Sequence, residues 1–227
     1  MHILKRPASI RVPFVFLWVL FGTGAAPAAQ EDLIDNHHRW QLLSYSRIPA
    51  NEVDFSDDEM VISVNSSASP VIYPLKTPAL LTQISVELSV EGVLNKTEKL
   101  QGGKGADDFL FRLGVVYEGD QTLGFFQRTL AADWVKKLFS LAPKGTGVSH
   151  IAFHNLYSDS RLMDQSRVHP ASHLLTEDFV APSGKYPLTF TITPEPQKKV
   201  LALWISSDGD DTQSRYKVRL KDFVVQL

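Results

Sequence analysis

Two carboxylates and a guanidinium near the middle of the chain have the residue types and spacing that chemistry requires. They are Asp107, Asp108 and Arg112. A carboxylate pair can hydrolyse a glycosidic bond when the two groups lie about 5 to 10 Å apart. Neighbouring strand residues point to opposite faces, however, so these two do not converge on one bond. We therefore interpret the pair as a strand boundary, with Asp108 pairing with Arg112.

A second acidic cluster, Asp208-Gly209-Asp210-Asp211, follows a strongly apolar run. Clustered carboxylates with a glycine can wrap Ca²⁺, which takes about six to eight oxygen ligands. Asp208, Asp210 and Asp211 supply fewer than that, and the same residue types also favour a hairpin turn. A turn is the first interpretation, and a weak calcium site is the alternative.

A third set of residues could form a binding face if the strands near 84–90, 109–117, 201–206 and 217–225 are neighbours. An aromatic platform with a few directional polar groups is typical of sugar-binding sites. The competing interpretation is an ordinary solvated face, because strand alternation alone produces charged surfaces. The residues predicted for this face are Glu87, Arg112, Trp204, Lys217 and Arg219.

Other catalytic and ligand-binding motifs are missing from the sequence. It has no cysteine, so disulfides, thiolate metal sites and cysteine nucleophiles are excluded. Its histidines form no His-Glu-x-x-His motif, and its serines lie in no Gly-x-Ser-x-Gly elbow. Gly102, Gly103 and Gly105 lack the Lys-Ser/Thr ending of a phosphate-binding loop. We assign no catalytic residue and expect a non-enzymatic protein.

The strand that must position Arg112 is the clearest in the chain. Phe109, Phe111, Leu113, Val115 and Tyr117 alternate along it and form one apolar stripe, which predicts a core-facing side. The opposite side carries the arginine and a glycine, which predicts a shallow, uncrowded surface.

Further alternating or apolar runs, separated by turn residues, predict more strands. These runs are 40–45, 60–65, 71–73, 84–90, 148–156, 188–192, 200–206 and 216–225. Residues 131–141 place Trp134, Leu138 and Leu141 at helical spacing, which predicts one short amphipathic helix. The fold class is therefore all-β, an antiparallel β-sandwich of jelly-roll or carbohydrate-binding-module type with one short helix.

The N-terminus has the pattern of a signal peptide. Lys5, Arg6 and Arg11 precede an apolar run over 12–22, and Ala26-Pro27-Ala28 fits the small-residue cleavage rule. The run is shorter than the ~20 residues of a membrane-spanning helix, although an uncleaved anchor is an alternative. We predict a signal peptide over 1–28, a single sandwich domain over 29–227 with no integral membrane segment, and a bacterial periplasmic or secreted protein.

The overall composition is that of a globular domain. The chain has 227 residues, of which 44% are hydrophobic and 21% charged, with a net charge of −2. This charge predicts no general attraction to nucleic acid or acidic lipid.

Two stretches resemble a bacterial exported family known as domain of unknown function 3047. They are Gly105 to Tyr117, with its Asp-Asp, aromatic and arginine pattern, and Leu203 to Thr212, with its acidic turn. The family has a tryptophan-rich strand where this chain has Ile84 to Val90, and an asparagine where it has Asp211. The resemblance implies an exported β-sandwich and no particular activity.

Three functions follow from these observations. The first is an exported, non-catalytic sandwich that binds a carbohydrate or a cell-envelope partner through its polar sheet face. The second is a polysaccharide-acting enzyme that uses Asp108, Glu87 or a histidine. The third is a structural component of an envelope assembly that docks through the helix at 131–141 and a loop at 158–170.

Overall fold

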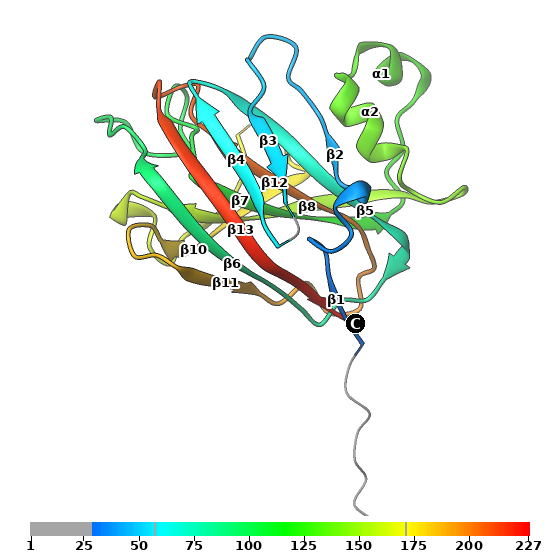
Figure 1. Cartoon of the computed structure of the whole chain (residues 1–227). Helices are drawn as coiled ribbons and strands as arrows, with labels where there is room; N and C mark the ends of the chain where they lie inside the picture. Colours follow the sequence, from blue (N-terminus) through cyan, green and yellow to red (C-terminus); the bar gives the residue numbers. More distant parts are fainter. Residues whose placement is uncertain (1–28, 57, 171) are drawn as a thin grey trace, which may run out of the picture.

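Two β-sheets pack face to face and enclose the main hydrophobic core (Figure 1). This computed structural model describes residues 29–56, 58–170 and 172–227. The predicted signal peptide over 1–28 lies outside the described residues. The prediction of an all-β sandwich is confirmed.

The first sheet has six strands, all paired antiparallel, in the order β11-β6-β13-β4-β3, with β1 beside the end of β13. Its strands are β1 (Gln30–Asp32), β3 (Glu52–Phe55), β4 (Met60–Asn65), β6 (Gln83–Val93), β11 (Leu188–Ile192) and β13 (Arg215–Gln226).

The second sheet has seven strands in the order β2-β5-β12-β7-β8-β10-β9, and it is mixed because β8 and β10 run parallel. Its strands are β2 (Gln41–Leu42), β5 (Ala68–Ala79), β7 (Phe111–Gly119), β8 (Gly147–Tyr157), β9 (Ser166–Val168), β10 (Leu175–Pro182) and β12 (Val200–Asp208).

Short helices lie outside the two sheets. The helix predicted over 131–141 corresponds to α2 (Asp133–Phe139). It is preceded by α1 (Phe125–Leu130), which the sequence pattern did not predict. The 3-10 turns are η1 (His37–Arg39) and η2 (Ser160–Leu162). The predicted loop over 158–170 contains η2 and β9.

The central strand faces the core as predicted, but its opposite side is not the uncrowded surface that we expected. Phe111, Leu113 and Tyr117 are fully buried between the sheets. Phe109 lies just before β7, outside its regular alternation, and belongs to a separate buried cluster. Arg112 is also buried, because a further layer of side chains covers the outer face of this sheet.

The acidic turn after β12 connects the two sheets rather than two neighbouring strands. β12 pairs with β5 and β7, whereas β13 pairs with β4 and β6. Between them, the N–H of Ser214 donates to the carbonyl of Gly209 at 2.9 Å. The hairpin interpretation was therefore wrong about pairing, although the turn itself was placed correctly. This crossing decides where the predicted binding residues lie.

Candidate functional site

The candidate site lies on the outer face of the seven-stranded sheet. Trp204 of β12, Gly114 of β7 and Phe153 of β8 stand side by side in the register of neighbouring strands. A Cβ on Gly114 would lie 2.8 Å from the Phe153 ring and 3.1 Å from the Trp204 Cβ. The glycine therefore leaves space for two large aromatic side chains to meet above the sheet.

A cavity of about 380 Å³ lies above these aromatic residues, and we call it the covered pocket. This volume is within the ~300–1,000 Å³ of small-ligand sites. Helix α2 covers it on one side, and the loop before β10 covers it on another. Its lining is Tyr45, Arg112, Trp134, Val135, Leu138, Phe139, Val148, His150, Ile151, Phe153, His169, Ser172, Leu174, Leu175 and Trp204.

Aromatic rings form much of the wall of the covered pocket. The Trp134 ring of α2 lies 5.5 Å from that of Trp204 at an interplanar angle of 76°. Tyr45 meets Trp134 edge-on at 6.3 Å, and Phe153 meets Trp204 at 6.0 Å. Edge-to-face pairs of this kind hold aromatic rings in fixed orientations. Trp134 is half-buried, so it is the ring best placed to meet an incoming ligand.

Arg112 forms the charged part of the pocket lining. Its Nη2 donates to Asp107 Oδ1 at 3.0 Å and lies 3.8 Å from Glu177 Oε1. Its Nε lies 3.9 Å from Asp208 Oδ2 and makes no hydrogen bond in the described structure. The guanidinium carbon also lies 4.6 Å from the centre of the Phe109 ring. Three carboxylates and an aromatic face thus fix this cation.

The electrostatics of the cluster follow from its burial. Burial alone would lower the pKa of Arg112, but Asp208, Asp107 and Glu177 raise it above the ordinary value. Burial raises the pKa of Asp208 to about 7, against the opposing effect of Arg112. For Asp107, burial acts to raise the pKa, but His169 and Arg112 outweigh it and leave that pKa lowered. At neutral pH the arginine is therefore charged and Asp208 is partly protonated.

The same cluster contains one set of metal-type ligands. Among the residues that the structure describes, only Asp107, His169 and Glu177 form a group of three whose ligand atoms lie within 4.8 Å of one another. Arg167 Nε, however, donates to Glu177 Oε2 at 2.7 Å, and Arg112 holds Asp107. Two guanidinium groups would repel a metal cation here. We interpret the group as a buried ion-pair network.

The predicted face is divided between the two sheets. Arg112 and Trp204 lie in the seven-stranded sheet, whereas Glu87, Lys217 and Arg219 lie in the six-stranded sheet. The expectation that all four strands are neighbours was therefore wrong, although β7 does pair with β12 and β6 with β13. Its cause is the turn between β12 and β13, which moves the chain to the other sheet.

The three residues on the six-stranded sheet belong to an open, charged surface. Arg219 donates to Glu91 Oε1 at 2.8 Å and to Glu59 Oε1 at 2.9 Å. Lys217 is exposed, and Glu87 is half-buried. This arrangement matches the solvated-face interpretation.

The Asp-Asp pair lies just before β7, as the strand-boundary interpretation expected, but its two carboxylates have other partners than predicted. Asp107 pairs with Arg112, while Asp108 accepts hydrogen bonds from the N–H and the hydroxyl of Thr212, both at 2.6 Å. The predicted pairing of Asp108 with Arg112 was wrong, because both aspartates precede β7 and the alternation of a strand does not apply to them. Asp108 holds the inter-sheet turn against the start of β7.

The carboxylates proposed for calcium have separate surroundings. Asp208 is buried beside Arg112, and Asp210 is half-buried. Asp211 is exposed and accepts the backbone N–H of Asp107 at 3.0 Å. Together they do not form a group of converging ligands among the described residues.

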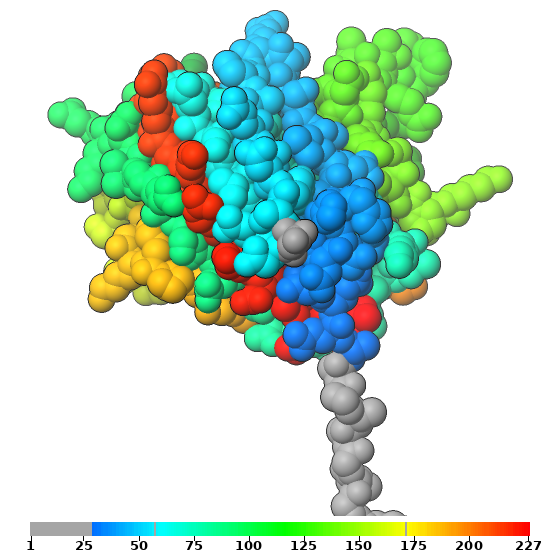
Figure 2. Space-filling view, in the orientation of Figure 1, coloured from blue at the N-terminus to red at the C-terminus, as the bar shows by residue number. Residues whose placement is uncertain are grey.

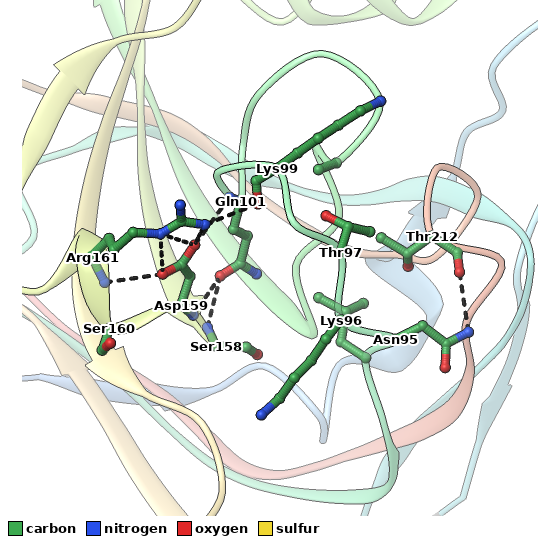
Figure 3. Close-up of a pocket in the computed structure, with 12 residues that line it drawn as sticks. Asn95, Lys96, Thr97, Lys99, Gln101, Ser158, Asp159, Ser160, Arg161 and Thr212 are labelled. Carbon is green, nitrogen blue, oxygen red and sulfur yellow. Dashed lines mark hydrogen bonds and ion pairs between the residues drawn. The ribbon is translucent and has the colours of Figure 1, made fainter.

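A second hollow, of about 260 Å³, lies between the loop after β6 and the start of η2 (Figure 3). Its polar groups mainly bind one another. Gln101 Oε1 accepts the N–H groups of Ser158 and Asp159, and Arg161 Nη2 donates to Asp159 Oδ2 at 2.6 Å. Figure 3 shows Asp159 directed at Arg161. These bonds join two loops, so we interpret this hollow as a structural junction.

Sequence reasoning missed several residues of the site. Trp134 was recognised as a helix residue, but nothing in the sequence placed that helix over β12. Tyr45, His169 and Glu177 gave no local signal, because only long-range packing brings them to the covered pocket or to the Arg112 cluster. The unbroken apolar run over 200–205 was the one available indication, since a strand buried on both faces lacks alternation.

No protein-family model matches the chain, and no curated protein matches it. A family 11 carbohydrate-binding module from Clostridium thermocellum, solved with a β-1,3-1,4-mixed-linked tetrasaccharide, is similar to the chain at 10% sequence identity and a TM-score of 0.41. The match covers 89% of this chain and 97% of that chain.

No helix within 29–56, 58–170 or 172–227 is long and apolar enough to cross a membrane.

Proposed function

We propose that this domain is a non-catalytic glycan-binding module that receives a sugar residue in the covered pocket. The observation that carries the proposal is the pairing of the Trp134 and Trp204 rings above Arg112 in one cavity. Sugar rings have apolar faces that stack on aromatic rings and hydroxyl edges that need directional polar partners. Tyr45 and His169, which also line the pocket, supply further polar groups.

The charge around Arg112 supports a neutral sugar rather than an acidic one. Asp107, Glu177 and Asp208 already surround the guanidinium within 4 Å. Because these carboxylates already compensate the cation, the carboxylate of a uronic acid would lose its water here without gaining a new ion pair. We therefore expect neutral glycans to bind more tightly than acidic glycans of the same length.

The proposal extends to location and partner. Export through the predicted signal peptide would bring the module to the periplasm or outside the cell, where envelope polysaccharides are available. The envelope-assembly hypothesis remains an alternative outcome of the test below, as does the polysaccharide-acting enzyme.

The test is calorimetric titration of neutral and acidic oligosaccharides chosen from a glycan array. We expect Trp134→Ala to raise the dissociation constant at least about tenfold, because an aromatic stacking surface is lost. Trp204→Ala should abolish binding. Because the Trp204 ring is buried, the melting temperature of this variant is measured as well, to separate lost binding from lost stability. Lys217→Ala, on the other sheet, is the matched control and should bind like the wild type.

Three results would contradict the proposal. One is the absence of any glycan bound on the array, and another is unchanged affinity in the Trp134→Ala variant. The third is release of new reducing ends from a bound polysaccharide, which would favour the enzyme instead. An envelope protein captured in place of glycans would favour the assembly hypothesis.

A further inference from the structure

The most exposed large apolar side chains of the described structure lie together on α1. Phe125, Phe126 and Leu130 are 83%, 81% and 86% exposed. The two phenylalanine rings pack edge-on at 5.7 Å, and no residue of α1 is buried. Exposed apolar groups concentrated in this way indicate an interaction surface.

The segment that carries these side chains projects from the sandwich. In Figure 1, α1 and α2 stand beside the sheets, at the end of the molecule away from the C-terminus. The space-filling view shows the same segment as a separate knob (Figure 2). The tip of α1 is therefore accessible to an approaching surface.

A cationic hollow lies next to the apolar tip. A cavity of about 470 Å³ between α1, α2 and the turn into β8 is lined by Arg128, Lys136 and Lys144, among others. Lys136 pairs with Asp133 at 3.0 Å, whereas no ion pair engages Arg128 or Lys144 in the described part of the chain. The segment 121–147 carries four cationic side chains and a single acidic one. The net charge of −2 for the chain thus conceals a local positive excess.

We propose that this knob docks the protein on an anionic phospholipid surface. The side chains of Phe125, Phe126 and Leu130 enter the boundary between headgroups and acyl chains. Arg128 and Lys144 bind headgroup phosphates beside them. Aromatic groups favour this boundary, and the combination of apolar insertion with cations is what gives peripheral proteins their membrane affinity. Charge complementarity selects an anionic lipid over a zwitterionic one.

The test is co-sedimentation of the full chain with vesicles of phosphatidylcholine alone or mixed with phosphatidylglycerol. We expect binding to the mixed vesicles only, weakened by high salt because exposed charges are screened. Arg128→Gln with Lys144→Gln should weaken binding roughly 25-fold, since each cation contributes about fivefold. Phe125→Ser with Phe126→Ser should weaken it at least about tenfold. Because all variants share residues 1–28, differences between them report on the knob.

A matched double variant changes the same chemistry elsewhere. Val93→Ser with Lys104→Gln removes one exposed apolar and one exposed cationic side chain outside the knob. It should sediment like the wild type. Equal binding by all variants, or binding to pure phosphatidylcholine vesicles alone, would overturn the proposal. Binding of soluble glycerol phosphate without vesicle binding would also overturn it, because the hollow would then be a site for a free anion.

Discussion

The outer faces of the two sheets are built in opposite ways. Along β13, exposed and buried residues alternate, so one face of the six-stranded sheet meets water. Every residue of β12 is buried, because α2 and neighbouring loops cover the outer face of its sheet. A strand with one open face keeps a period of two in its sequence, whereas a strand covered on both faces loses it. The covered face is the one that encloses a pocket.

Two arginines show what this difference means for a charge. Arg219 on the open face pairs with Glu59 and Glu91, where water screens all three groups. Arg112 on the covered face has a side chain only 9% exposed, and its partner Glu177 is fully buried. Loss of the arginine should therefore cost more stability on the covered face than on the open face, although both arginines pair with carboxylates. Substitutions in the core that both sheets share should cost more than substitutions on either outer face.

Replacing Phe111 with Asp should have the largest effect. Phe111 is fully buried and meets Phe190 of the opposite sheet at 5.4 Å between ring centres. A carboxylate there has no partner and would remove more than about 4 kcal/mol of unfolding free energy. We expect no cooperative thermal transition by circular dichroism. Lys217→Asp on the open face is the control and should melt normally. A Phe111→Asp variant with the wild-type melting temperature would refute the assignment of this core.

Arg112→Met should have the second largest effect on stability. It keeps much of the side-chain volume but leaves Asp107, Glu177 and Asp208 without their shared cation. Removing one partner of a buried ion pair costs about 3–5 kcal/mol. Urea denaturation should show this loss, together with loss of glycan binding. A variant as stable as the wild type would mean that water screens the cluster.

Asp208→Asn tests the covered face through pH. The pKa of Asp208 is raised from 3.8 to about 7, so the folded state binds its proton more tightly than the unfolded state. Its stabilising contribution is present in acid and is lost as the pH rises through about 7. The asparagine variant should therefore gain stability relative to the wild type over this range, by a few kcal/mol at most.

The control for this pH prediction is Asp58→Asn on the open face. Its pKa is lowered by hydrogen bonding to Lys221 and by the charge of that lysine. The aspartate therefore stabilises the protein above its ordinary pKa, and the variant should lose a little stability as the pH rises. The measurement is the melting temperature of each variant relative to the wild type across the pH range. If this difference changed in the same direction with rising pH for both variants, the described burial of Asp208 would be contradicted.

Arg219→Met should have the smallest effect, because its two ion pairs lie at the open surface. We expect a melting temperature close to that of the wild type and unchanged glycan affinity. A loss comparable to that of Arg112→Met would show that ion pairs on the two faces are energetically alike.

The sequence predicted the positions of the strands better than it predicted which strands pair with each other. The alternation over 60–65 and 188–192 predicted β4 and β11 with their observed bounds. The short strands β1, β3 and β9 went unpredicted, because three or four residues give too little periodicity, and the eight-residue β10 was missed as well. Helix α1 was missed because its apolar residues do not pack on a core. The candidate site was predicted only at Arg112 and Trp204.

The local pattern of residues thus determined the fold class, the core-facing side of β7 and the position of the turn at 208–212. Only the tertiary structure decided that this turn crosses between sheets, which separates Lys217 and Arg219 from Trp204. It also decided that Asp107, rather than Asp108, binds Arg112, and that α2 covers a pocket. The physical reason is that alternation fixes which face of a strand a side chain occupies. The strand neighbours and the groups that cover that face depend on contacts between residues far apart in the chain.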